Sequence, residues 1–173
     1  MTAVQNTWRV FGASVTGKAH LDKAIPCQDA HAHAVVSGVL VAIVCDGAGS
    51  ARLSEQGAQF VAAQTVQALA GRLEQGASVQ DLHDGALAGT LAQIRAALDD
   101  IARAANATLD DYASTVVGVV MGQDAGFFFH LGDGLGVAQL IDGGELISLP
   151  ANGTRPPPPP ATTRTLSARV ILR

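Results

Sequence analysis

Two aspartates, Asp29 and Asp46, lie at the outer ends of two apolar runs that are joined by the pair Ser37-Gly38. A two-residue turn fixes the register of a hairpin, and this register places Asp29 directly opposite Asp46, with Cβ atoms about 4.5–5.5 Å apart. Two carboxylates at that distance repel each other unless one binds a proton or a cation lies between them. Their hard oxygen atoms suit Mg²⁺ or Mn²⁺, and Gly47 would bring a backbone carbonyl to the same ion. The alternative is a pair of solvated acids at strand ends.

Three further residues carry chemical groups of interest, two in the first of these apolar runs and one between later apolar runs. His31 and His33 alternate on the same strand face as Asp29 and are either metal ligands or half-buried strand histidines. Asp133 lies between two glycines, which is typical of a turn.

The cysteines, Cys27 and Cys45, are not expected to form a disulfide. The hairpin register puts Cys45 opposite Ala30, three residues from Cys27. This separation is about 10 Å at ~3.3 Å per residue, which exceeds the reach of a disulfide. We interpret both as small apolar residues in the reduced state.

The hairpin belongs to a chain that changes from strand to helix periodicity and back. Runs of apolar or alternating residues bounded by turn residues predict strands at residues 7–15, 30–36, 39–45, 115–121, 127–131, 135–141 and 145–149. Residues 17–29 are expected to form a loop. Apolar residues at steps of three and four predict a helix with its N-cap at Ser54 and a second helix over 79–105. Because hairpins connect the strands, we expect antiparallel sheets and the α+β class.

The composition excludes several classes of protein. The chain has 173 residues, a net charge of -4 and no Lys/Arg run, so a nucleic-acid partner is not expected. The sequence contains no apolar stretch of the ~18 residues that span a bilayer, and its start lacks the features of a signal peptide. We therefore expect a cytoplasmic protein with no membrane partner.

The last part of the chain differs from the rest. Five consecutive prolines occupy positions 156–160, and basic residues follow them. Prolines in a row favour an extended polyproline conformation without ladder hydrogen bonds. We expect one domain over residues 1–152 and a poorly ordered tail over 153–173.

Taken in order, these motifs resemble the metal-dependent protein phosphatase family, type 2C. The resemblance covers residues 8–152 and includes two long helices between its motifs. It is carried by an opening strand from Trp8 and by Pro26-Cys27-Gln28-Asp29-Ala30, Asp46-Gly47-Ala48-Gly49-Ser50, Ala113-Ser114-Thr115 and Gly132-Asp133-Gly134.

The resemblance implies two antiparallel β-sheets packed as a sandwich, flanked by long antiparallel helices, with a metal centre at one end. It implies that Asp46 bridges two Mn²⁺ or Mg²⁺ ions, that Asp29 and the Gly47 carbonyl are further ligands, and that Asp133 helps to hold a third ion. The implied reaction is hydrolysis of phosphoserine or phosphothreonine by metal-activated water. The implied partners are a phosphoprotein substrate and a Ser/Thr kinase.

The sequence departs from the family pattern at three points. Ala48 stands where the family often has a histidine that is proposed as a general acid. The phosphate-binding arginine of the first loop is missing, and we assign its role to Lys18 or His20. Residues 153–173 contain no Asp or Glu, so they cannot supply the family's later acidic motifs. We therefore expect a fold that is incomplete at its C-terminus.

Three functions remain open from the sequence. The first is a metal-dependent phosphatase. The second is a non-catalytic phosphatase-like interaction module or an inactive truncated product. The third is an unrelated α+β protein that binds a small molecule.

Overall fold

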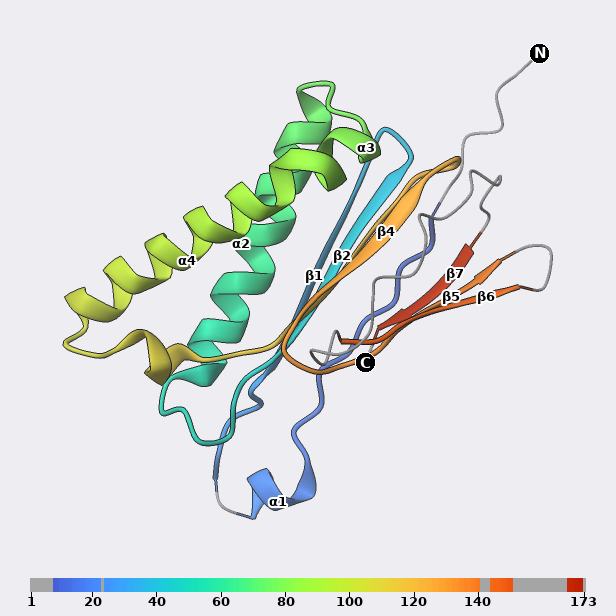
Figure 1. Ribbon diagram of the computed structural model, residues 1–173. Coiled ribbons are helices and arrows are strands. Elements are labelled where there is room, and N and C mark those ends of the chain that lie inside the picture. Colours follow the sequence, from blue (N-terminus) through green and yellow to red (C-terminus); the bar gives the residue numbers. More distant parts are fainter. Residues whose placement is uncertain (1–7, 23, 141–143, 151–167, 173) are drawn as a thin grey trace.

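The computed structural model describes residues 8–22, 24–140, 144–150 and 168–172, which form two antiparallel sheets and two long helices (Figure 1). The larger sheet has the order β1-β2-β3-β4 and the smaller one the order β6-β5-β7. These elements confirm the α+β class. The strands of the larger sheet are β1 (Asp29–Val36), β2 (Val39–Asp46), β3 (Val116–Met121) and β4 (Gly126–Leu131). Those of the smaller sheet are β5 (Gly136–Leu140), β6 (Glu145–Ser148) and β7 (Ala168–Leu172).

The β1–β2 hairpin has the turn and the register that the sequence predicts. Ser37 and Gly38 both adopt positive φ angles, 51° and 80°, which is the backbone of a type I′ turn and matches the twist of the two strands. The register pairs Asp29 with Asp46 at the open end of the hairpin. The prediction of this pairing is therefore confirmed.

Two long helices cover one face of the larger sheet (Figure 1). The first, α2 (Ser54–Glu74), buries one stripe of residues against β1 and β2, and the predicted stripe is confirmed. The stripe consists of Ala62, Val66, Leu69 and Leu73. The second, α4 (Leu87–Ala104), packs beside α2 through Leu98 and Ala102. Among the residues that the structure describes, no helix is long and apolar enough to cross a bilayer.

The start of α2 differs from the prediction. Leu53 occupies the N-cap position, and no side chain caps this end. The hydroxyl of Ser54 instead accepts a hydrogen bond from Gln28 Nε2 at 2.8 Å. Ser54 is thus a buried tertiary contact rather than a cap.

The second predicted helix is divided into three parts. It begins as α3 (Val79–Asp81), continues as the π-helical turn η1 (Leu82–Ala86) and becomes α4. Within the π turn Leu82 is fully buried, and His83 lies edge-on to Phe127, with ring centroids 5.1 Å apart.

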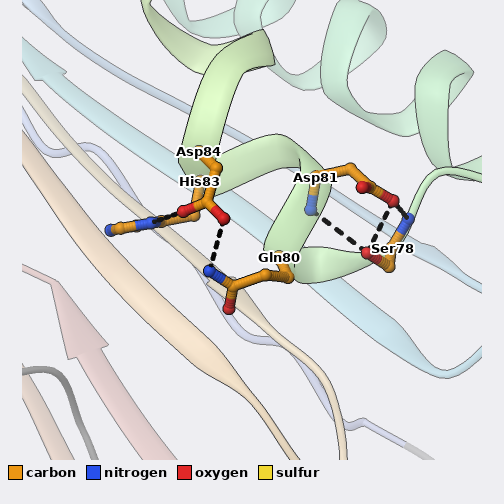
Figure 2. A network of polar contacts seen from close by, with 5 residues as sticks. All are labelled: Ser78, Gln80, Asp81, His83 and Asp84. Carbon is orange, nitrogen blue, oxygen red and sulfur yellow. Dashed lines mark hydrogen bonds and ion pairs between the residues drawn. The ribbon is translucent and has the colours of Figure 1, made fainter.

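Polar side chains fix the entry into this helical segment (Figure 2). The backbone N–H and the hydroxyl of Ser78 donate to Asp81 at 2.8 and 2.6 Å, and the Asp81 N–H donates back to Ser78 Oγ at 3.1 Å. These bonds form a capping box. Gln80 donates to Asp84 at 2.7 Å, and Asp84 also contacts His83 at 2.8 Å.

The predicted strand at residues 7–15 is not observed in its described part. Residues 8–17 have no regular structure, and Phe11 and Val15 are exposed. Trp8 and Val10 still pack on the larger sheet, and Trp8 Nε1 donates to the Gly38 carbonyl at 3.0 Å. The apolar pattern therefore reflects packing of this segment without strand pairing.

Two short helical turns lie near the ends of the larger sheet. The turn α1 (Lys18–Leu21) occurs within the predicted loop, and it lies beyond the end of the sheet that is opposite α3 (Figure 1). The 3₁₀ turn η2 (Leu109–Tyr112) precedes β3, and its buried Tyr112 packs with α4.

The smaller sheet contacts the larger one through a small apolar cluster. Ala138 of β5 is fully buried together with Leu40, Val119 and Met121 of the larger sheet. This contact places the smaller sheet on the side away from the helices (Figure 1). The described residues do not establish a complete sandwich.

Part of the predicted tail is ordered. Residues 168–172, which we expected to be poorly ordered, form β7, and this strand pairs antiparallel with β5. Val170 and Ile171 are residue types that favour strands, and this preference acts against disorder there. The remaining tail positions, 153–167 and 173, and the predicted strand's residue 141 lie outside the described residues.

Candidate metal centre

The candidate site begins with the two facing carboxylates. Asp29 is the first residue of β1, and Asp46 is the last residue of β2. Partial burial raises the pKa of Asp46 most, and the negative charge of Asp29 and a hydrogen bond between the two carboxyl groups raise it further. This is the behaviour expected of two acids held close together.

Two other predicted residues act on the same carboxyl group. The charge of Asp133 also raises the pKa of Asp46, whereas that of His20 lowers it. The structure therefore brings Asp133, from the turn after β4, and His20, from α1, within electrostatic reach of the pair. Lys18 is an exposed residue of the same helical turn as His20.

The backbone on both sides of Asp46 is fixed by the segment that leads into β3. The Asp46 N–H donates to Thr115 Oγ1 at 3.1 Å, and the Thr115 N–H donates to the Asp46 carbonyl at 2.8 Å. Ala48 N–H donates to the Ala113 carbonyl at 2.9 Å, and Gly47 bridges to Ser114. Two motifs that are far apart in the sequence thus lie side by side.

Gly47 is required by packing at this position. Its N–H donates to the Gln28 carbonyl at 3.1 Å. A Cβ atom on Gly47 would lie 2.8 Å from that carbonyl oxygen and 2.9 Å from both the backbone carbon and the Cβ of Ser54. The sequence favours a glycine here because its carbonyl could reach an ion, whereas the structure gives a steric reason.

Three residues at this end of the sheet were missed by the sequence analysis. Gln28 and Ser54 hydrogen-bond each other, and Thr115 holds the backbone of Asp46. Gln28 and Thr115 belong to motifs that we singled out, but only the tertiary contacts reveal what their side chains do.

The strand histidines do not join the carboxylate pair. His31 Nδ1 is hydrogen-bonded to Ser14 Oγ at 3.1 Å, and its ring lies against Gly12. His33 is exposed on β1. Within the described parts of the chain, no group of three or more His, Cys, Asp or Glu side chains is arranged to hold a metal ion.

The residues present fit a divalent cation in the kind of donor that they offer. Two carboxylates that repel each other are stabilised by a cation between them, and their oxygen atoms suit Mg²⁺ or Mn²⁺. This fit is limited to Asp29 and Asp46, since Asp133 acts on Asp46 through its charge but does not complete a group of three ligands among the described residues.

The cysteines behave as the register predicts. Cys45 is paired with Ala30 and is buried, whereas Cys27 is half-buried, and both thiols are free. Burial raises the pKa of the Cys45 thiol to about 12.

The structure thus shows an α+β chain with two facing carboxylates at one end of an antiparallel sheet, and comparison with known proteins assigns it to a family. The family model described as protein phosphatase 2C matches residues 16–155. The chain therefore belongs to the protein phosphatase 2C family, and this resemblance suggests a hydrolase.

A relative from Escherichia coli strain K12 is similar to this chain. It is serine/threonine-protein phosphatase 3, which is 28% identical over 152 residues. The aligned region covers 85% of this chain and 59% of the relative, so the chain spans little more than half of that protein's length. No solved structure matches the chain.

Proposed function

We propose that this protein is a metal-dependent phosphatase that hydrolyses phosphoserine and phosphothreonine in proteins. The observation that carries the proposal is the facing pair Asp29 and Asp46. Burial raises the pKa of Asp46, and the negative charge of Asp29 raises it further. Membership of the protein phosphatase 2C family supports the same function.

In this proposal Asp29, Asp46 and the Gly47 carbonyl hold two Mn²⁺ or Mg²⁺ ions, and Asp133 helps to hold a third. When bound, the ions would supply a water of lowered pKa and offset the charge of the phosphoryl oxygens. Lys18 or His20 binds the phosphoryl group as a point charge, in place of the bidentate contact that an arginine would make.

The proposed function also includes a sandwich architecture, a protein substrate and a kinase partner. The two sheets form the sandwich that the family resemblance implies, and the shared cluster around Ala138 supports this arrangement. The substrate is a phosphoprotein, its partner enzyme is a Ser/Thr kinase, and the reaction takes place in the cytoplasm.

Hydrolysis of p-nitrophenyl phosphate with millimolar Mn²⁺ tests the proposal. The expected result is activity that requires Mn²⁺ and that falls about 100-fold or more in Asp46→Asn, because one carboxylate of the site is lost. Asp124→Asn is the matched control, since this exposed residue lies in the β3–β4 turn at the other end of the sheet. Equal rates in the unchanged protein and in Asp46→Asn would contradict the proposal.

A second candidate function is a non-catalytic phosphatase-like interaction module. Ala48 in the place of a general acid favours it, as does the lack of a three-ligand cluster among the described residues. This candidate predicts a folded protein that releases no phosphate with any divalent cation.

A further inference from the structure

Gln28 and Ser54 form a partly buried hydrogen bond next to the carboxylate pair. Gln28 Nε2 donates to Ser54 Oγ at 2.8 Å. Ser54 is 1% exposed, although it opens a helix and its hydroxyl caps no backbone group there. A buried hydroxyl in such a position needs a partner, and Gln28 supplies it.

This bond joins the segment before Asp29 to the helix that follows Asp46. Gln28 directly precedes Asp29, and Ser54 opens the helix that follows the loop after Asp46. Gly47 lies against both Gln28 and Ser54. Its N–H donates to the Gln28 carbonyl at 3.1 Å. The close approach of Gln28 and Ser54 to Gly47 leaves no room for a Cβ atom.

We infer that Gln28 is a positioning residue that, through Ser54, clamps the start of β1 and the Gly47 backbone against the start of α2. The clamp keeps Asp29 facing Asp46 and holds Gly47 beside them. This inference rests on the proposed function, because the geometry it protects is that of the candidate metal centre.

The amide of Gln28 suits this position for a chemical reason. It donates to Ser54 without adding charge, whereas a carboxylate there would lack the N–H donor and place a further negative charge beside Asp29 and Asp46. Loss of either partner leaves the other polar group unpaired in a partly buried place, which weakens the clamp.

A titration of the full chain with Mn²⁺, in which electron paramagnetic resonance measures the free Mn²⁺, tests the inference. Gln28→Met keeps the length of the side chain without its hydrogen bond, and Ser54→Ala removes the acceptor. We expect each to weaken Mn²⁺ binding about five-fold, the effect of one hydrogen bond. The double variant should bind no more weakly than either single variant, because all three lack the same bond.

Gln59→Met is the matched control. Gln59 is exposed on α2, and its amide donates to Glu55 at 3.2 Å, so the same substitution there removes a surface hydrogen bond on the same helix. We expect its Mn²⁺ affinity to be unchanged. All variants are compared at a temperature where circular dichroism shows them folded, so that a general loss of stability does not enter the comparison.

Hydrogen exchange of the Gly47 amide gives a readout that needs no metal. We expect faster exchange in Gln28→Met and Ser54→Ala than in Gln59→Met, because Gly47 donates to the Gln28 carbonyl. Unchanged Mn²⁺ affinity in both clamp variants would overturn the inference. If the parent chain binds no Mn²⁺, the proposed function fails instead. In that case hydrogen exchange of the Gly47 amide alone tests the positioning role of Gln28. Unchanged exchange in Gln28→Met and Ser54→Ala would overturn that role.

Discussion

At the scale of single residues, Gly47 links the two halves of the candidate site. The position that a Cβ atom would take on Gly47 faces the Gln28 carbonyl and the start of α2, at distances that exclude a methyl group. The residue type is therefore determined by contacts with two segments, one before β1 and one after β2.

We predict that Gly47→Ala lowers the free energy of unfolding by about 1–3 kcal/mol, because the added methyl group must displace the backbone of Gln28 or Ser54. It should also reduce Mn²⁺-dependent hydrolysis. Urea unfolding measures the first effect. Gly49→Ala is the control, since a Cβ atom there meets only Gln28 Oε1 at 4.0 Å. Equal stability of the two variants would contradict the steric argument.

The two thiols should differ in reactivity. Burial raises the pKa of Cys45 to about 12, so almost no thiolate forms at pH 8, whereas Cys27 is half-buried. We predict that Ellman's reagent labels one thiol quickly in the native protein and both in urea. The fast phase should disappear in Cys27→Ser and persist in Cys45→Ser. Fast labelling of Cys45 in the native state would show that β2 opens easily.

At the scale of elements, the packing of the two long helices contains two unpaired hydroxyls. Thr65 of α2 and Thr90 of α4 are 0% and 2% exposed. Within the part of the chain that the structure describes, neither Oγ1 atom has a hydrogen-bond partner. A buried hydroxyl without a partner lowers stability.

We predict that Thr65→Val and Thr90→Val each raise the free energy of unfolding by about 1 kcal/mol, because valine has the same shape without the unpaired oxygen. Thermal or urea unfolding provides the measurement. Thr108→Val serves as the contrast and should lower stability, since the Thr108 hydroxyl donates to Asp111 at 3.0 Å. A loss of stability in both helix variants would mean that these hydroxyls are satisfied in solution.

At the scale of the whole molecule, a polar contact joins the two sheets. His130 of β4 and Ser148 of β6 are hydrogen-bonded, with Nε2 and Oγ 2.6 Å apart, and burial lowers the pKa of His130. Its Nδ1 atom is buried and has no hydrogen-bond partner among the described residues. Protonation would therefore place an unpaired N–H and a positive charge between the sheets.

We predict that stability falls as the pH decreases from about 6.5, the ordinary pKa of histidine, through the lower pKa of His130 in the folded state. The direction follows because the unfolded chain binds the proton more tightly than the folded chain. Urea unfolding at several pH values measures this slope. His130→Gln should reduce the slope in this range, while His33→Gln, an exposed site on β1, should not. An unchanged slope in His130→Gln would contradict the prediction.

Features that depend on local patterns could be predicted from the sequence. Ser37-Gly38 determined the hairpin turn, and the turn length then determined that Asp29 faces Asp46. The spacing of apolar residues identified the buried face of α2. The ordered motifs identified the protein phosphatase 2C family. Each of these signals comes either from residues that are close together in the chain or from the order of the motifs along it.

Features that depend on neighbours distant in the sequence became visible only in the folded chain. An apolar pattern cannot tell whether a partner strand is present, so residues 8–17 pack on the sheet without pairing. Ser54 matches a helix cap by type, but Gln28 reaches its hydroxyl across the chain. Residues 168–172 become a strand because β5 lies beside them. The side-chain partners of Gly47 and Asp46 are likewise set by folding, because they come from segments that the sequence separates.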